Sequence, residues 1–289
     1  MLVTRKIKSL FLLPAIVVCV LLGIAALVMA LRGETDALAW WGALIAALPL
    51  PLIIARITWT EAPRTPENEP LALLVASAGT LVAAWEYLID GSSGWLPLAA
   101  AALGLLLLVL YVFWYSRFGR IASGKLDVGS KLPEFSLTDI DGNPVSSTDL
   151  AGTPAVLIFF RGNWSAVCRG QVAEVAAYSE RLAALGARVT LISPQPASAS
   201  RELAEKYGVP YQFWVDEGNR VAAALDIAAA FGVPAGVRGD YAPDTVMPTV
   251  VATNARGTIL YSDQTDNYRL RPEPDLFIAV LRRAGAIAS

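Results

Sequence analysis

Four long apolar segments in the first 120 residues constrain this chain more than any other feature. Leu10–Leu31 and Trp95–Ser116 carry no charged residue, and Ala37–Ala55 and Pro70–Trp85 lie between them. Each is close to the about 20 residues that a helix needs to cross the hydrocarbon core of a bilayer. We therefore expect residues 1–120 to form an α-helical membrane region with four transmembrane helices, the second of them kinked by its prolines.

Composition separates this region from the rest of the chain. The whole sequence is 55% hydrophobic and 17% charged, but the first 120 residues hold only eight of its 23 Lys and Arg and seven of its 25 Asp and Glu. Residues 121–289 thus have the charge content of a slightly acidic globular domain, which we expect to be a second unit. Because no basic face is evident in it, we expect no nucleic-acid partner.

The placement of Lys and Arg predicts an orientation. Three basic residues precede the first apolar segment, two (Arg56 and Arg64) lie between the second and third segments and three follow the fourth, whereas the third loop, Asp90–Gly94, has none. Because Lys and Arg favour the cytoplasmic side, we expect a multi-pass protein of the cell membrane, surrounded by lipid, with both termini and residues 121–289 in the cytoplasm. The second loop, Glu61–Pro70, is rich in proline and charge and predicts a plain surface connection.

One stretch in the second half of the chain places a cysteine at the start of a helix. Ala155–Phe160 has the branched and aromatic residues of a buried strand, Gly162 interrupts it, and the sequence from Ser165 onward is helical. Ser165 is a favourable N-cap residue, so Cys168 falls in the first turn. Unpaired backbone N–H groups and the positive end of the helix dipole there lower the pKa of a thiol and favour the thiolate.

The chain has no histidine and only two cysteines, Cys19 and Cys168. The absence of histidine excludes Cys–His pairs, Ser–His–Asp triads and most zinc sites, and we expect neither a metal nor a cofactor. Cys19 lies within the first apolar segment, where a packing role is favoured. Cys168 has no cysteine partner in its own domain, so a redox cycle there requires an external thiol.

Strands and helices alternate through residues 130–287. A hairpin with its turn at Asp139–Pro144 comes before the strand and helix described above. Further strands are expected at 188–193 and 210–216, helices at 199–207, 218–225 and 274–284, and an antiparallel pair at 249–252 and 257–262. This order predicts an α/β domain of the thioredoxin-like type.

The segment before and around Cys168 resembles the active site of the alkyl hydroperoxide reductase/thiol-specific antioxidant family, the peroxiredoxin-like group of the thioredoxin superfamily. One bacterial branch of that family has the motif Arg-Gly-X-Trp-Cys-Pro-X-Cys, which Arg161, Gly162, Trp164 and Cys168 match. Ser165 stands where that branch has its first cysteine, so the Cys-X-X-Cys dithiol is here Ser-X-X-Cys. Typical peroxiredoxins also have Thr or Ser three residues before their reactive cysteine.

Other motifs extend this resemblance over roughly residues 130–287. The segments that resemble the family are Pro133–Leu137, Ile192–Gln195, Ala204–Pro210, Asp216–Asn219 and Asn267–Pro274. The last of these corresponds to the approach to the final helix of the domain. The resemblance covers none of the membrane region.

The resemblance implies catalytic roles for Cys168, Ser165 and Arg161. Cys168 would be the nucleophile, and the alternative is a small buried hydrophobic residue. The Ser165 side chain would accept the Cys168 N–H as a helix cap, and its hydroxyl would also donate to the thiolate. Arg161 is either the cation nearest to the thiolate or a solvated residue at the end of a strand.

A substrate-binding role is implied for Trp164, Met247, Pro248 and Thr249. Met247-Pro248-Thr249 resembles the cis-proline loop of the thioredoxin fold, which lies against the active cysteine and exposes backbone for an extended thiol partner. The alternative is a trans proline that opens an edge strand. Trp164 would form a hydrophobic rim beside the thiol or cover the helix.

These observations predict a membrane-anchored, peroxidase-like thiol oxidoreductase with a single reactive cysteine. Cys168 would attack a peroxide or a disulfide and be restored by an external thiol reductant or a protein thiol partner. One alternative is a catalytically inactive thioredoxin-fold binding module, anchored to the membrane, that uses the Pro248 loop. Another is a component of thiol or cofactor traffic in which the helices matter more than the thiol.

Overall fold

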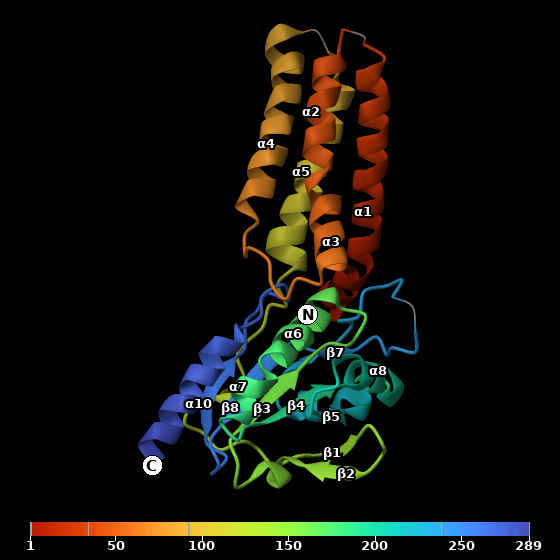
Figure 1. The fold of residues 1–289 in the computed structure, drawn as a ribbon. Coiled ribbons are helices and arrows are strands. Elements are labelled where there is room, and N and C mark those ends of the chain that lie inside the picture. The colour runs from red at the N-terminus through yellow and green to blue at the C-terminus, as the bar shows by residue number, and fades with distance from the viewer. Residues whose placement is uncertain (1, 34, 92, 238, 289) are drawn as a thin grey trace. The chain divides into compact units, whose positions relative to one another are not determined.

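The computed structural model describes residues 2–33, 35–91, 93–237 and 239–288. Ser92, within the predicted third loop, and Ser289, at the C-terminal end, lie outside the described residues. The chain forms two compact units (Figure 1). One contains 10–60 and 65–117 and is helical; the other contains 1–9, 61–64 and 118–289 and is built around a β-sheet.

The helical unit contains the four predicted apolar segments as helices. Its elements are residues 10–31 of α1 (Leu2–Leu31), α2 (Ala37–Ala47), α3 (Pro49–Thr60), α4 (Pro70–Trp85) with the π-helical end η1 (Glu86–Asp90), and α5 (Trp95–Val109) with the π-helical end η2 (Leu110–Tyr115). The second segment is divided before Pro49, because proline lacks the N–H that would continue the helix. By length and composition, four stretches can cross a membrane: Val3–Leu31, Ala37–Thr60, Pro70–Asp90 and Trp95–Tyr115.

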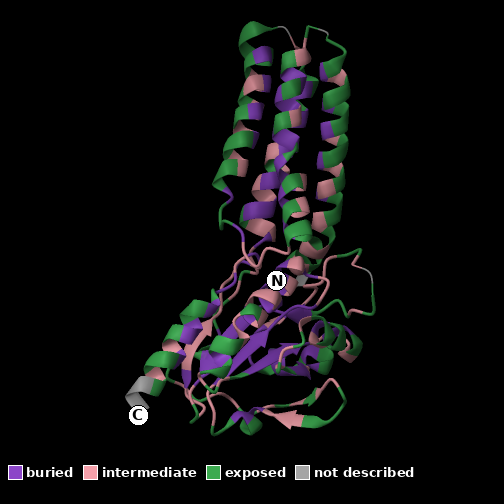
Figure 2. Cartoon of the chain, in the orientation of Figure 1, coloured by how far each residue is buried: buried purple, intermediate pink, exposed green. Residues whose placement is uncertain are grey.

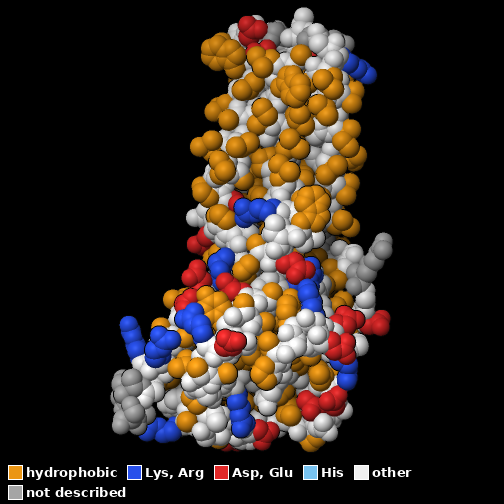
Figure 3. Space-filling view, viewed as in Figure 1, with side chains coloured by type: hydrophobic (Ala, Val, Ile, Leu, Met, Phe, Trp, Pro, Cys, Tyr) orange, Lys and Arg blue, Asp and Glu red, His pale blue; other side chains and the backbone are white. Residues whose placement is uncertain are grey.

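Small residues bring the helices of this unit together. A Cβ on Gly42 of α2 would lie 2.6 Å from the carbonyl oxygen of Gly79 in α4, and one on Gly104 of α5 would lie 3.0 Å from that of Ala46. Such close approach through Gly and Ala is typical of helices packed in lipid. The larger apolar side chains cover the outside of the unit, where Figure 3 shows them in orange.

The other unit is built on a seven-stranded sheet in the order β2-β1-β5-β4-β3-β8-β9. Its strands are β1 (Ser136–Asp139), β2 (Pro144–Ser146), β3 (Ala155–Phe159), β4 (Arg188–Ser193), β5 (Gln212–Val215), β8 (Thr249–Thr253) and β9 (Ile259–Asp263). The strand before the cysteine, β3, pairs in parallel with β4 and antiparallel with β8. All five of its residues are buried, as Figure 2 shows for the centre of the sheet.

Helices cover both faces of this sheet. They are α6 (Ala166–Ala177), α7 (Ser179–Ala183), α8 (Ala197–Tyr207), α9 (Arg220–Ala224) and α10 (Pro274–Ala288), with 3-10 turns η3 (Gly124–Leu126), η4 (Ser147–Leu150) and η5 (Glu217–Asn219). One core cluster joins Cys168 and Val172 of α6 to Phe277 of α10, and a second joins Leu126 and Leu225 to the opposite face. A small second sheet pairs β6 (Ala228–Ala229) with β7 (Thr245–Val246).

The predicted α/β architecture is confirmed. The hairpin, the two strands after α6, the terminal antiparallel pair and the last helix lie where the sequence placed them, with ends that differ by a few residues. Helices on both faces of a mixed sheet, with an antiparallel pair and a closing helix, form a thioredoxin-like domain. The stretch that leads to Cys168 therefore leaves the sheet from an interior strand, β3, which lies between β4 and β8.

Candidate active site

The turn from β3 to α6 places Cys168 as the sequence predicted. β3 ends at Phe159, Ser165 occupies the N-cap position, and α6 begins at Ala166. Cys168 is the third residue of the helix, in its first turn. Its backbone N–H donates to the carbonyl oxygen of Ser165 over 3.0 Å.

Gln195, which follows the neighbouring strand β4, holds the backbone of this turn in place. Gly162 has a φ of 137°, a region that favours glycine. The next backbone N–H, that of Asn163, donates to Oε1 of Gln195 over 2.7 Å, and Nε2 of Gln195 donates to Ser200 over 2.9 Å. A Cβ on Gly162 would meet both Trp164 and Gln195, so the tight turn needs glycine.

Cationic and polar groups converge on the buried sulfur of Cys168. The residue is 1% exposed, and Nη2 of Arg271 donates a hydrogen bond to its Sγ over 3.5 Å. Burial opposes ionisation more than any other single influence. The charge of Arg271, a hydrogen bond from Ser165, the charge of Arg161 and the hydrogen bond from Arg271 together outweigh it, so the pKa of Cys168 is lowered.

Ser165 is an N-cap residue by position but not by its side chain. No side-chain capping hydrogen bond is present, so the expected acceptance of the Cys168 N–H by the Ser165 side chain is wrong. The backbone carbonyl oxygen of Ser165 accepts that N–H instead. The hydroxyl acts on the Cys168 sulfur, the other role considered from the sequence. The Ser165 hydroxyl thus interacts with the sulfur and does not cap the helix.

Arg161 is a buried cation, and the alternative of a solvated strand end is wrong. It is 6% exposed, and its Nη2 donates to the carbonyl oxygen of Gly232. Its guanidinium carbon lies 4.4 Å from the ring centroid of Trp164 and 5.1 Å from that of Tyr268. Trp164 therefore packs on the cation rather than standing alone beside the thiol.

The sequence reasoning missed Arg271, which hydrogen-bonds to the sulfur and whose charge lowers the pKa of Cys168 more than the charge of Arg161 does. Its Nη1 donates to the carbonyl oxygens of Tyr268 and Leu270, which orients the guanidinium toward Cys168. The signal was present, because Arg271 belongs to the motif Asn267–Pro274 that resembles the family. That motif was assigned to the approach to the last helix without a role for its arginine.

The Met247–Pro248 loop differs from the prediction. No cis peptide bond occurs in the described residues, so the expected cis bond before Pro248 is wrong and the trans alternative holds. The backbone of Met247 is also engaged: its N–H donates to Ile227 over 2.7 Å, and its carbonyl accepts the Thr249 hydroxyl over 2.8 Å. The Pro248 carbonyl accepts Nη1 of Arg120 over 2.9 Å. The loop therefore offers no free backbone for an extended partner at Met247.

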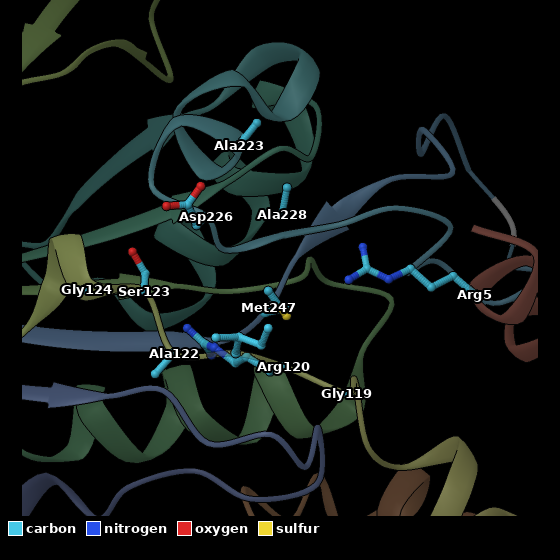
Figure 4. Close-up of a pocket in the computed structure, with 11 residues that line it drawn as sticks. Arg5, Gly119, Arg120, Ala122, Ser123, Gly124, Ala223, Asp226, Ala228 and Met247 are labelled. Atoms are coloured by element: carbon cyan, nitrogen blue, oxygen red, sulfur yellow. The ribbon is translucent and has the colours of Figure 1, made fainter. Parts of the chain in front are cut away.

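Met247 lines a cavity that does not include Cys168. This cavity has a volume of about 450 Å³, and Figure 4 shows Arg5, Arg120, Ser123, Asp226 and Met247 among its lining side chains. The structure thus brings Cys168, Ser165, Arg161 and Trp164 together, as the sequence suggested. It places the Met247 side chain in this separate cavity.

Comparison with known proteins shows which family the α/β unit is similar to. Residues 128–262 match the AhpC/TSA family. A putative chloroplastic peroxiredoxin Q from Oryza sativa subsp. indica is 34% identical over 120 residues, which is 42% of this chain and 52% of that protein. Peroxiredoxin Q from Gentiana triflora is 35% identical over 115 residues, 40% of this chain and 50% of that protein. The chain spans about half the length of these curated relatives.

Solved structures give similar matches. Peroxidoxin BcpB from Mycobacterium tuberculosis aligns with a TM-score of 0.46 and 20% identity, over 55% of this chain and 97% of that protein. AhpC from Enterococcus faecalis aligns with a TM-score of 0.45 and 18% identity, over 56% and 93%. The sequence match over residues 128–262 and the sheet described above support a peroxiredoxin-like, thioredoxin-superfamily α/β unit that is similar to the AhpC/TSA family.

Proposed function

We propose that this chain is a membrane-anchored, thiol-dependent peroxidase whose reactive group is Cys168 in a Ser-X-X-Cys site. The observation that carries the proposal is the convergence of Arg271 and Ser165 on the Cys168 sulfur at the first turn of α6. Two donors aimed at a buried sulfur stabilise its ionised form, and the thiolate is the nucleophile in thiol chemistry.

The reaction proceeds by displacement at oxygen. The Cys168 thiolate attacks one oxygen of a hydroperoxide, an S–O bond forms and the O–O bond breaks, which leaves cysteine sulfenic acid and an alkoxide that takes up a proton. Sulfur loses two electrons and the peroxide gains them. The guanidinium groups of Arg271 and Arg161 supply positive charge where the leaving oxygen becomes negative.

Regeneration requires thiols from outside the α/β unit. Cys168 is its one cysteine, since Cys19 belongs to the helical unit. One external thiol condenses with the sulfenic acid, releasing water and forming a mixed disulfide. A second thiol attacks that disulfide, which restores Cys168 and leaves the reductant oxidised.

Burial favours a small substrate. A sulfur in a side chain that is 1% exposed can meet a hydroperoxide after a small movement of its neighbours, whereas a protein disulfide needs a wide opening. The rival function, an inactive binding module that uses the Pro248 loop, loses support because the backbone of that loop is hydrogen-bonded within the domain.

The membrane part of the proposal rests on the four helices of the other unit. Their length, their apolar composition and the alternation of Lys and Arg between loops support a four-span protein with the α/β unit in the cytoplasm. In that compartment small thiols and thioredoxin-like proteins are available as reductants.

Peroxide consumption by the full-length protein tests the proposal. The purified protein in detergent receives hydrogen peroxide and dithiothreitol, and its rate is compared with those of Cys168→Ser and Cys19→Ser. We expect wild type and Cys19→Ser to consume peroxide at similar rates, and Cys168→Ser to fall to the uncatalysed background. Equal rates in all three proteins, or background rates in wild type, would overturn the peroxidase assignment.

A further inference from the structure

The connection between α3 and α4 is part of the α/β unit, although it was expected to be a plain surface connection. Residues 61–64 cluster with residues 118–289 and not with the helices on either side of them in the sequence. They read Glu61-Ala62-Pro63-Arg64, and we call them the 61–64 segment. These residues contact α6, the helix that contains Cys168, and are linked to the loop that precedes it.

The segment touches α6 two residues beyond the reactive cysteine. A Cβ on Gly170 would collide with the carbonyl oxygen of Glu61 and would lie 2.9 Å from the backbone nitrogen of Pro63. No real side chain tolerates such distances, so backbone meets backbone here only because residue 170 is glycine. Glu61 itself has a φ of 46°, a left-handed conformation that a residue with a side chain adopts only when its surroundings hold it.

Glu61 forms a first link, to the loop that precedes Cys168. Its Oε1 accepts Nε of Arg169 over 2.7 Å, and Nη1 of Arg169 donates to the carbonyl oxygen of Asn163. Lys206 of α8 adds an ion pair to Glu61 at 3.6 Å. The hydrogen bond from Arg169 outweighs burial and lowers the pKa of Glu61, so the carboxylate is charged near neutral pH.

Arg64 forms a second link, to the arginine that faces the sulfur. Its Nε donates to the backbone carbonyl oxygen of Arg271 over 3.1 Å, while its Nη2 pairs with Glu174 of α6. Arg64 therefore ties the backbone of Arg271 to the same helix that carries Cys168. The guanidinium of Arg271 then donates to Sγ.

We propose that the 61–64 segment is a positioning element of the thiol site, which holds Arg271, the Asn163 loop and the first turn of α6 in the arrangement that the Cys168 sulfur requires. This inference rests on the proposed function, because it concerns the reactivity of the same thiol. The ion pairs are partly solvated and each is weak as a source of stability. They instead fix positions: two links from one short segment reach the loop before Cys168 and the backbone of Arg271.

Alkylation of Cys168 as a function of pH tests this role in the full-length protein, reconstituted in nanodiscs and carrying Cys19→Ala so that one thiol remains. The midpoint of the profile reports ionisation, and the plateau rate at high pH reports access. Arg64→Ala removes the second link. Gly170→Ala adds a methyl group where the Glu61 carbonyl lies and displaces the segment without changing any charge.

Two matched variants serve as controls. Arg181→Ala breaks a similar ion pair, with Asp275 at 2.6 Å, which joins α7 to α10 and involves no residue of the 61–64 segment. Gly285→Ala adds a methyl group to a helix position with no atom within 4 Å. Both controls keep the 61–64 segment intact.

We expect Arg64→Ala and Gly170→Ala to move the midpoint to higher pH and to slow alkylation at pH 7 about tenfold, the loss expected when a hydrogen bond to an ionised group is weakened. The controls should retain the wild-type profile. The positioning role would be overturned if Arg64→Ala and Gly170→Ala both kept the wild-type midpoint of the pH profile. It would also be overturned if the two control variants showed the same shift in that midpoint. If the wild-type protein alkylates but forms no sulfenic acid, the peroxidase assignment fails while the positioning role survives.

Discussion

Nη2 of Arg271 donates a hydrogen bond to Sγ of Cys168 over 3.5 Å, which joins two residues 103 positions apart in the sequence. The thioredoxin-like fold makes this contact possible, because the segment that leads into α10 passes the first turn of α6. A cation so placed stabilises the thiolate against the cost of burial. In the proposed function, arginine takes the role that in many thiol enzymes belongs to histidine, a residue that this sequence lacks.

Replacement of Arg271 should slow the reaction of Cys168 with peroxide. A hydrogen bond to a charged group is worth about 1.5–3 kcal/mol, so Arg271→Ala should lower the second-order rate constant at pH 7 by roughly 10- to 100-fold. Stopped-flow tryptophan fluorescence after mixing with hydrogen peroxide measures this rate. Arg256→Ala is the control, since Arg256 is exposed on the turn between β8 and β9. An unchanged rate in Arg271→Ala would show that the contact has no kinetic role.

The Ser165 hydroxyl should matter for reactivity more than for stability. A true N-cap contributes about 1 kcal/mol, but the Ser165 side chain makes no capping hydrogen bond. We expect the free energy of unfolding of Ser165→Ala to lie within a few tenths of a kcal/mol of the wild-type value. Cys168 in this variant should be alkylated more slowly at neutral pH. Denaturant unfolding of the detergent-solubilised protein, followed by near-UV circular dichroism, supplies the first comparison. If Ser165→Ala loses 1 kcal/mol or more of unfolding free energy while Cys168 is alkylated at the wild-type rate, the Ser165 side chain is a helix cap after all.

Stability should rise with pH through the ionisation of Cys168. Its pKa in the folded protein is lowered, chiefly through Arg271 and Ser165 acting against burial. The unfolded thiol titrates near its ordinary pKa of about 8.5. Between these two pKa values the unfolded state binds more protons, so stability increases with pH there, is complete above the unfolded pKa, and is lost as pH falls through the folded pKa. The melting temperature of wild type should therefore rise relative to that of Cys168→Ser as pH increases over that interval. If the melting temperature of wild type instead falls relative to that of Cys168→Ser as pH rises, the pKa of Cys168 is raised in the folded protein and the assigned direction is wrong.

Orientation in the membrane can be tested with reporters. Charged loops alternate along the helical unit, so a fusion after Ser289 and one inserted within residues 91–94 should report opposite compartments. We expect green fluorescent protein to be fluorescent at Ser289 and alkaline phosphatase to be active in the 91–94 loop. Phosphatase activity at Ser289 would place the thiol on the outer side and require a different source of reductant.

Much of the fold could be predicted from local patterns. The run Ala155–Phe159 is uniformly apolar, and it proved to be an interior strand of the sheet that is buried along its whole length. Apolar segments close to the bilayer thickness proved to be helices. The position of Cys168 in the first turn followed from Gly162 and Ser165, two residues whose conformational preferences are strong.

The features that could not be predicted from the sequence depend on contacts between segments that are distant along the chain. Arg271 and Arg64 look like ordinary surface arginines in sequence, and only the fold brings them to the sulfur and to each other. The 61–64 segment has the proline and charge of a surface connection, a pattern that does not reveal a backbone contact with Gly170. The Pro248 loop was misjudged because the resemblance to the thioredoxin fold carried over a peptide geometry that this chain does not have.

Trapping of the oxidised thiol tests the central claim most directly. The full-length protein with Cys19→Ala is treated with one equivalent of hydrogen peroxide in the presence of dimedone, which captures sulfenic acid, and its intact mass is measured from pH 5 to pH 9. We predict one dimedone adduct per chain, located on Cys168, with full yield already at neutral pH. A chain that remains unlabelled until it is denatured would contradict the account and leave Cys168 as a buried structural residue.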